Sequence, residues 1–185
     1  MREQIKVSKL LKERVLPFSF SIFVILADQI SKFLVEKYIP LRTIKFSFFG
    51  DFLRIIHVTN TGAAFSMGDS MSDIKHLIVL CIIPLVLLIA LIVFCIKSDD
   101  FSYFQRWLIA GITGGGFGNL IDRFFRPNGV VDFIDVKFYN LFGLERWPTF
   151  NIADSFVLVC IIILAISYIK TMVEESTAKK QENQK

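Results

Sequence analysis

An uncharged stretch of twenty residues, Leu77–Ile96, constrains this chain more than any other feature of its sequence. Its length matches the roughly 20 residues that a helix needs to cross a hydrocarbon core about 30 Å thick. Pro84 lies inside this stretch and predicts a local break in the helical hydrogen bonding. Three further stretches, residues 17–35, 103–121 and 149–169, are of similar length and mostly apolar. We therefore predict an all-α membrane protein, a bundle of four transmembrane helices within residues 17–173.

The composition supports a membrane protein and excludes several other classes. Apolar and aromatic residues make up 54% of the 185 positions, and the mean hydropathy is +0.56. A soluble domain has ~45–50% apolar residues even when glycine is counted among them. The same numbers exclude a disordered chain and a collagen. Cys81, Cys95 and Cys160 all lie in apolar runs and lack the spacing of a metal site or a disulfide scaffold.

The distribution of basic residues predicts the orientation of the four helices. Four crossings put both termini on one side, which holds the basic head (residues 1–16) and the polar tail (residues 174–185). With Lys97, Arg106 and Lys170, this side carries eleven Lys and Arg residues, whereas the other two connections, residues 36–76 and 122–148, hold nine over a longer length. Because cytoplasmic segments are enriched in Lys and Arg, we expect both termini in the cytoplasm.

The first outer connection predicts a small β-unit over residues 40–66. Ile44, Phe46 and Phe48 alternate with polar residues, Gly50-Asp51 is typical of a turn, and residues 52–58 are again β-branched and aromatic. This pattern favours a β-hairpin, which we expect to rest on the outer membrane surface. The second outer connection contains another extended run, Val130–Tyr139.

Ionisable residues inside the spans are functional candidates because they are costly at membrane depth. Asp28 and Lys32 lie four residues apart on the first span and can form an ion pair along the helix. Two interpretations are open. Either the pair is purely structural and Lys32 extends to the outer interface, or the pair faces the bundle interior and orients an active-site group.

The third span combines small residues with polar ones at its outer end. Half of the ten glycines lie in it: Gly111, Gly114, Gly115, Gly116 and Gly118. Glycines at this density indicate close helix–helix packing, and no nucleotide-binding motif accompanies them. Asn119 and Arg123 follow, four residues apart on one helix face, so that both can point toward a shared site.

Two aspartates near the outer ends of the third and fourth spans are the best catalytic candidates. Asp132 is flanked by apolar residues, and desolvation there would raise its pKa. Asp154 follows Asn151 by three residues at the start of the fourth helix, a spacing that also fits a purely structural capping box. Two carboxylates that meet at one depth share a proton, as in aspartic peptidases. Such a pair can activate a water and protonate a leaving group.

Other chemistries have weaker support in the sequence. His57 and His76 have no partner pattern around them, and the three cysteines lie well inside apolar helices. A Ser/Lys arrangement of Ser66 with Lys32 is not supported by spacing. The G-x-G-D motif of presenilin-type and prepilin-type proteases is absent, because Gly118 is followed by Asn119.

Two hypotheses use the same carboxylates differently. A hard cation would suit oxygen ligands from Asp132, Asp135 and Asp154, but no phosphate-handling motif accompanies them and we predict neither a metal nor another cofactor. A small transporter or channel with a proton or cation relay through Asp28, Asp132 and Asp154 is the alternative from another functional class.

Five short blocks follow one another over about 130 residues: DQISK at 28–32, NTGAAFS at 60–66, GNLIDR at 118–123, VVDF at 130–133 and FNIADS at 150–155. In this order they resemble the lipoprotein signal peptidase family (signal peptidase II), bacterial enzymes that cleave prolipoproteins. The resemblance implies four transmembrane helices with cytoplasmic termini and a small extracytoplasmic β-cradle.

The resemblance also implies roles for individual residues. The catalytic aspartates of the family fall on Asp132 and Asp154 of this sequence. The polar residues around the family's site fall on six positions: Asp28, Lys32, Asn60, Asn119, Arg123 and Asn151.

The implied substrate is a diacylglyceryl-prolipoprotein, cut just before the lipid-modified cysteine of its lipobox. Globomycin-type inhibitors occupy the site in this family. We accordingly expect a monomeric aspartic endopeptidase in the bacterial cytoplasmic (inner) membrane. Its active site would lie near the outer face, in contact with membrane lipids, and it would bind no nucleic acid.

Overall fold

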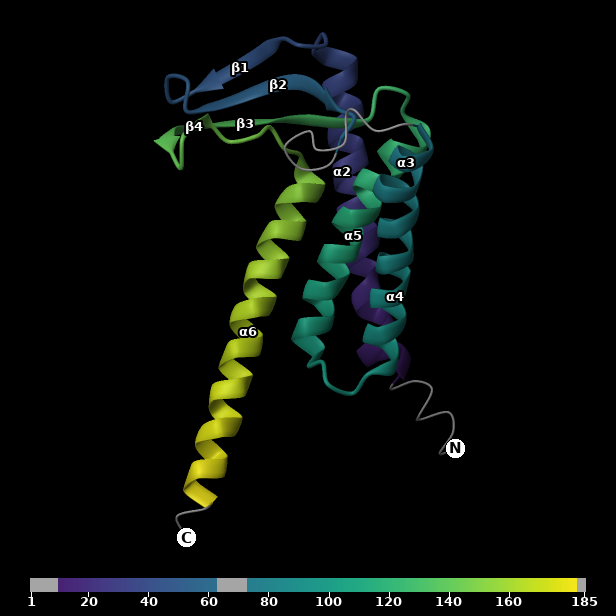
Figure 1. Cartoon of the computed structure of the whole chain (residues 1–185), viewed down its shortest axis with the longest axis vertical. Helices are drawn as coiled ribbons and strands as arrows, with labels where there is room; N and C mark the ends of the chain where they lie inside the picture. The colour runs from purple at the N-terminus through teal and green to yellow at the C-terminus, as the bar shows by residue number, and fades with distance from the viewer. Residues whose placement is uncertain (1–9, 63–72, 183–185) are drawn as a thin grey trace.

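A computed structural model of the chain describes residues 10–62 and 73–182. The helices extend from one side of a small β-sheet, which lies at one end of the molecule (Figure 1). The helical elements are η1 (Leu11–Val15), η2 (Leu16–Phe18), α2 (Ser19–Tyr38), α3 (Asp73–Leu77), η4 (Ile78–Ile82), α4 (Ile83–Lys97), α5 (Tyr103–Phe125) and α6 (Ile152–Glu182). The strands are β1 (Ile44–Phe48), β2 (Leu53–Asn60), β3 (Val130–Leu141) and β4 (Leu144–Arg146).

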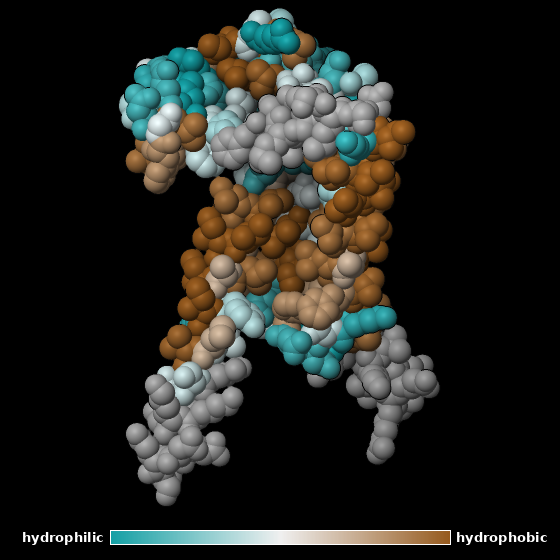
Figure 2. All heavy atoms as spheres, in the orientation of Figure 1, coloured by the Kyte–Doolittle hydropathy of each residue, from teal (hydrophilic) through white to brown (hydrophobic). Residues whose placement is uncertain are grey.

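Among the described residues, three continuous helical segments are long and apolar enough to cross a membrane: Leu11–Tyr38, Ile74–Lys97 and Ile152–Glu174. On the face drawn in Figure 2, a hydrophobic band covers the helices, with hydrophilic residues over much of the sheet and at the opposite end of the shorter helices. The predicted membrane-type helical fold with a small antiparallel sheet is therefore confirmed. The predicted span 103–121 forms part of α5, whose glycines and polar residues lower its hydropathy.

Two helices have features beyond the predicted spans. The fourth helix, α6, continues to Glu182, well past the predicted end of its span at residue 169. The second apolar segment contains a π-helical turn, η4, immediately before the α4 segment that carries Pro84. Proline has no backbone N–H to continue the regular ladder, and a π-helical turn is a known way to absorb such a disruption.

The four strands form one antiparallel succession, β1-β2-β3-β4. The predicted hairpin is present as β1 and β2, joined by a turn in which Phe49 and Gly50 have positive φ angles of 52° and 71°. Strand β2 also pairs with β3, so that Val58 lies opposite Asp132 and Asn60 opposite Val130. The sheet thereby joins the two outer connections and carries Asp132 above the helices.

Helix α5 lies among the other helices and contacts α2, α4 and α6. Its glycines allow these contacts to be close. A Cβ atom added at Gly114 would lie 2.8 Å from the backbone oxygen of Ser21 in α2, and one at Gly115 would lie 2.5 Å from that of Ala153 in α6. The predicted role of the glycine run in helix packing is confirmed.

An apolar core fastens the sheet to the helices. Val35 and Ile39, at the end of α2, are buried against Val131 and Phe133 of β3. Ile152, the first residue of α6, packs on the same cluster. Because burial of such side chains contributes about 1.5–3 kcal/mol each, this core holds β3 and the start of α6 in fixed positions beside α2.

Candidate active site

Asn151, which immediately precedes α6, joins the two candidate catalytic aspartates. Its Nδ2 atom donates to Oδ1 of Asp132 at 2.7 Å. Its backbone N–H donates to Oδ2 of Asp154 at 3.1 Å, and its Oδ1 atom accepts from the backbone N–H of Asp154 at 2.9 Å. The predicted capping box is therefore present, and the same residue also binds the second carboxylate. Asn151 and Asp154 therefore cap the helix and at the same time belong to the candidate site, so the two interpretations do not exclude each other.

Asn119 of α5 makes a second connection. Its Nδ2 atom donates to Oδ1 of Asp154 at 2.7 Å. Its Oδ1 atom accepts hydrogen bonds from Nδ2 of Asn151 at 3.0 Å and from Nζ of Lys32 at 2.9 Å. Side chains from α2, α5, β3 and the start of α6 thus form one continuous hydrogen-bonded network.

Lys32 lies at the centre of a buried ion cluster below the aspartates. Its Nζ atom is 2.8 Å from Oδ2 of Asp28 and 2.8 Å from Oδ2 of Asp122, and all three side chains are fully buried. The predicted ion pair between Asp28 and Lys32 is confirmed. The interpretation that Lys32 reaches the outer interface is wrong, because its ammonium group has all its partners inside the bundle.

Two members of this cluster, Gln29 and Asp122, had no predicted role although both lie in the quoted sequence blocks. Nε2 of Gln29 lies 3.0 Å from the Gly118 carbonyl oxygen and 2.9 Å from Oδ1 of Asp122. Oδ1 of Asp122 also accepts from Nε of Arg126 at 3.0 Å. A carboxylate directly before Arg123 at the end of an apolar helix was the available signal.

Arg123 and Asn60 lie beside the aspartates and meet at Gly62. Arg123 donates from Nη2 to the Gly62 carbonyl oxygen at 3.2 Å, and Oδ1 of Asn60 accepts from the Gly62 N–H at 3.0 Å. The buried Nε of Arg123 has no hydrogen-bond partner among the described residues. A cavity of about 450 Å³ adjoins this arginine and is also lined by Thr61 and Phe124.

The environment of Asp132 favours its protonated form. Burial raises the pKa of Asp132 to about 7, and the negative charge of Asp154 adds to this effect. Hydrogen bonds from Asn151 and Asn60 and the charge of Lys32 act in the opposite direction. One carboxyl group of the pair therefore holds a proton below neutral pH.

The competing sites are not assembled in the described part of the chain. His57 and His76 bind the backbone carbonyl oxygens of Ile39 and Thr61. Asp135 faces Arg146, whose Nε lies 2.6 Å from its Oδ1. Among residues 10–62 and 73–182 no group of three His, Cys, Asp or Glu side chains is placed to hold a metal. Ser66 lies outside the described residues.

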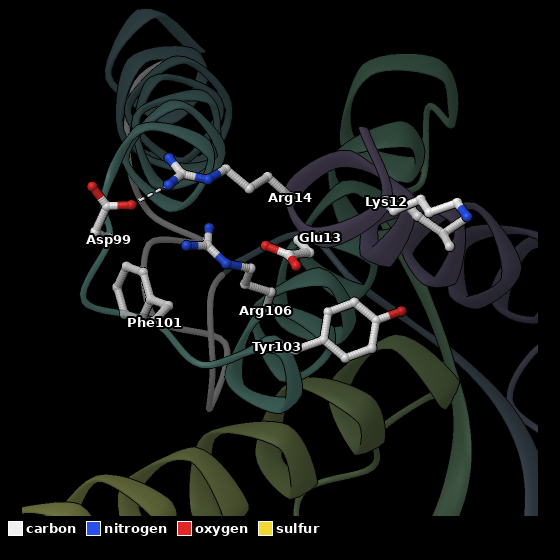
Figure 3. A pocket seen from close by; sticks show the side chains of 8 residues that line it. Lys12, Glu13, Arg14, Asp99, Phe101, Tyr103 and Arg106 are labelled. Carbon is white, nitrogen blue, oxygen red and sulfur yellow. Dashed lines mark hydrogen bonds and ion pairs between the residues drawn. The ribbon is translucent and has the colours of Figure 1, made fainter. Parts of the chain in front are cut away.

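A second cavity, of about 530 Å³, lies at the opposite end of the bundle (Figure 3). Two arginines that line it cap the C-terminal end of α4. Arg14 donates to the Ile96 carbonyl oxygen at 2.9 Å, and Arg106 donates to the carbonyl oxygens of Cys95 and Ser98. These contacts satisfy the exposed carbonyls and the negative end of the α4 dipole. The two arginines thus have a structural role in this cavity.

The profile of the family described as "Signal peptidase (SPase) II" matches residues 20–170, which include every residue of the network. The chain belongs to the signal peptidase II family. A "Lipoprotein signal peptidase" of Treponema pallidum is 46% identical to it over 172 residues, which cover 93% of this chain and 92% of the relative. The protein of the same name from Treponema denticola is 48% identical and covers 91% and 96% of the two chains.

A solved structure agrees with this assignment to the signal peptidase II family. It is described as a bacterial membrane enzyme and superposes with a TM-score of 0.71 at 32% identity, over 85% of this chain and 89% of that one. The chain is therefore a membrane-bound protease that removes signal peptides from prolipoproteins, as its sequence blocks predicted. The alternative of a transporter or channel is not favoured.

Proposed function

We propose that this signal peptidase II is an aspartic endopeptidase in which Asp132 and Asp154 act on one water molecule. The observation that carries the proposal is the hydrogen-bonded path from Asp132 through Asn151 and Asn119 to Asp154. It holds two carboxyl groups from separate elements in a single network. Carboxylates so coupled titrate as a pair, and one proton shared between them provides an acid and a base at the same pH.

The chemistry needs only these two groups and water. The ionised carboxylate takes a proton from the water, whose oxygen attacks the scissile carbonyl carbon, while the protonated carboxyl donates its proton to the carbonyl oxygen. Collapse of the tetrahedral diol breaks the C–N bond. The leaving amine takes the proton that the base received from water, and a diol hydroxyl returns a proton to the acid. No metal or other cofactor takes part in this scheme.

Arg123 is the residue best suited to bind substrate at this site. Lys32, Asn151 and Asp154 occupy both polar atoms of the Asn119 amide, whereas the buried Nε of Arg123 has no partner among the described residues. Arg123 also borders the 450 Å³ cavity. We therefore assign to it the carbonyl oxygens of the substrate backbone or of the diacylglyceryl group, with the peptide cut before the lipid-modified cysteine.

The arrangement of the helices supports a four-span topology. The described ends of the chain, near Leu11 and Glu182, both lie at the end opposite the sheet (Figure 1). With α5 packed against the three apolar segments as the remaining span, residues 17–173 form the peptidase domain. By the charge distribution, the termini are then cytoplasmic, in the bacterial inner membrane, and the aspartates lie near its outer face.

Apolar side chains on the sheet suit contact with lipid. Phe49 and Phe142, each in a strand-connecting turn, are both highly exposed. Exposed aromatic residues of this kind favour a membrane interface, where the substrate's acyl chains also lie. We propose that the enzyme works there as a monomer and that globomycin-type inhibitors occupy the space around Arg123.

Cleavage of a diacylglyceryl-modified prolipoprotein by the purified protein tests the proposal. Asp132→Asn and Asp154→Asn should each lower the rate by about 100- to 10,000-fold, because each removes a proton-transfer group. Asp135→Asn is the matched control, since it makes the same change on the same strand at a carboxylate that binds Arg146. Globomycin should inhibit the wild type, and a chelator should not. Full activity of either active-site variant, or loss of activity on chelation, would contradict an aspartic mechanism.

A further inference from the structure

The orientations of the Asn119 and Asn151 amides are set by groups that can only donate hydrogen bonds. The ammonium group of Lys32 has three protons and no lone pair, and its three close partners are oxygen atoms of Asp28, Asp122 and Asn119. The oxygen of the Asn119 amide must therefore face Lys32. Its NH2 group is consequently directed at Oδ1 of Asp154.

The orientation of the Asn151 amide is fixed in a similar way. The backbone N–H of Asp154 can only donate, and it lies 2.9 Å from Oδ1 of Asn151. The NH2 group of Asn151 is therefore on the other side, where it reaches Oδ1 of Asp132 and Oδ1 of Asn119. Neither amide can rotate by 180° without bringing two donors or two acceptors together.

The two carboxyl groups consequently have unequal surroundings. Both oxygens of Asp154 accept N–H donors, one from Asn119 and one from the backbone of Asn151, and the residue lies in the first turn of α6. Such donors and the positive end of a helix stabilise a carboxylate anion.

Asp132 also accepts hydrogen bonds from Asn151 and Asn60, but it lies on a strand, not at the start of a helix, and burial acts on it more strongly than these donors do. The charged groups around it come from three elements: Lys32 of α2, Arg123 of α5 and Asp154 of α6. The negative charge of Asp154 favours a proton on Asp132, whereas the two cations oppose it.

From this geometry we infer that Lys32 is a positioning residue. By orienting the Asn119 amide, it makes Asp154 the ionised general base and Asp132 the proton-carrying acid at the start of the cycle. The inference rests on the proposed function for the roles in catalysis, but the location of the proton is a property of the free enzyme. Asp154 then takes the proton from water, and Asp132 protonates the substrate carbonyl oxygen.

Two double variants isolate the hydrogen bond from Lys32 to Asn119. Asp28→Asn/Lys32→Gln and Asp28→Asn/Lys32→Met each remove one positive and one negative charge, and their side chains at position 32 are similar in length. Only glutamine keeps an N–H donor for Oδ1 of Asn119. We expect kcat of the methionine variant to be about tenfold below that of the glutamine variant. Equal kcat values and equal pH profiles in the two variants would overturn the inference.

Infrared spectroscopy of the resting enzyme at pH 6 locates the proton without any turnover. The absorption of a buried, protonated carboxyl group should be lost in Asp132→Asn. It should be retained in Asp154→Asn, because burial, the larger effect, still favours the proton on Asp132 when the charge of Asp154 is gone. The opposite pattern would overturn the assignment even if neither double variant folds. Because this measurement needs no substrate, it can succeed where prolipoprotein cleavage fails, which separates the inference from the proposed function. Ser21→Ala serves as a control for both measurements. It removes another buried contact between α2 and α5 and should leave the carboxyl absorption in place.

Discussion

Gly115 of α5 meets the backbone of Ala153 in α6 so closely that an added Cβ atom would lie 2.5 Å from the Ala153 carbonyl oxygen. Ala153 directly precedes Asp154. We therefore predict that Gly115→Ala forces α5 and α6 apart, displaces Asp154 from Asn119, and lowers both thermal stability and the rate of prolipoprotein cleavage. Thermal unfolding in detergent and a cleavage assay measure the two effects.

Gly116→Ala is the matched control for this substitution. The three atoms nearest to its added Cβ atom would all belong to the flexible side chain of Leu88, with the two terminal methyl groups at 2.8 Å. Alanine also favours a helix by about 1 kcal/mol over glycine. Gly116→Ala should thus be much less harmful than Gly115→Ala. Equal losses in the two variants would show that glycine matters here for reasons other than the α5–α6 contact.

The pH dependence of catalysis should show an alkaline limb near pH 7. The pKa of Asp132 is raised to about 7 by burial and by Asp154. The mechanism requires this group to be protonated, so kcat/KM should fall as the pH rises above that value. Initial rates on a lipidated peptide between pH 5 and pH 9 check the prediction. A rate that is constant from pH 6 to pH 9 would contradict it.

The same carboxyl group should make folding stability depend on pH. Its pKa is 3.8 in the unfolded chain and about 7 in the folded one, so the folded state binds the extra proton between these values. The stability that Asp132 contributes is then fully present below about pH 4 and is lost as the pH rises through about 7. Asp132→Asn lacks this loss. Compared with the wild type, it should be more stabilising at pH 8 than at pH 5, by about 3 kcal/mol at most, since two pH units separate pH 5 from the folded pKa.

Removing one carboxylate from the Lys32 cluster should be strongly destabilising. Among the described residues, Asp122→Ala leaves Lys32 with one carboxylate, Asp28, and the amide of Asn119, and it removes a partner of Gln29 and of Arg126. Breaking a buried ion pair in this way costs about 3–5 kcal/mol. The exposed pair of Arg14 with Asp99 provides the comparison, and Asp99→Ala should cost less than about 1 kcal/mol. Chemical unfolding of both variants distinguishes these values.

Local spacing made part of the site predictable. Asp28 with Lys32 and Asn151 with Asp154 are separated by four and three residues, distances at which helix geometry alone decides that side chains meet. The glycine run of α5 was equally direct, because only close packing explains so many small residues in one helix.

Contacts between distant segments could not be derived in this way. The pairing of β2 with β3 places Val58 opposite Asp132, and no pattern in either strand specifies that register. Asp122 reaches Lys32 only because α5 lies against α2 at the height that the glycines allow. The lower hydropathy of α5 agrees with its position, since a helix surrounded by other helices has less need of apolar residues than one that faces lipid.

The proposed active site draws on segments far apart in the chain, beginning with Asp28 in α2 and ending with Asp154 in α6. Among the described elements, α6 is the last to leave the ribosome. A nascent chain that has emerged only as far as β3 already carries Asp132, but it lacks Asn151 and the second carboxylate. If Asp132 and Asp154 act together as we propose, a chain that ends at β3 has no proteolytic activity, and the site is complete only when the start of α6 has joined it.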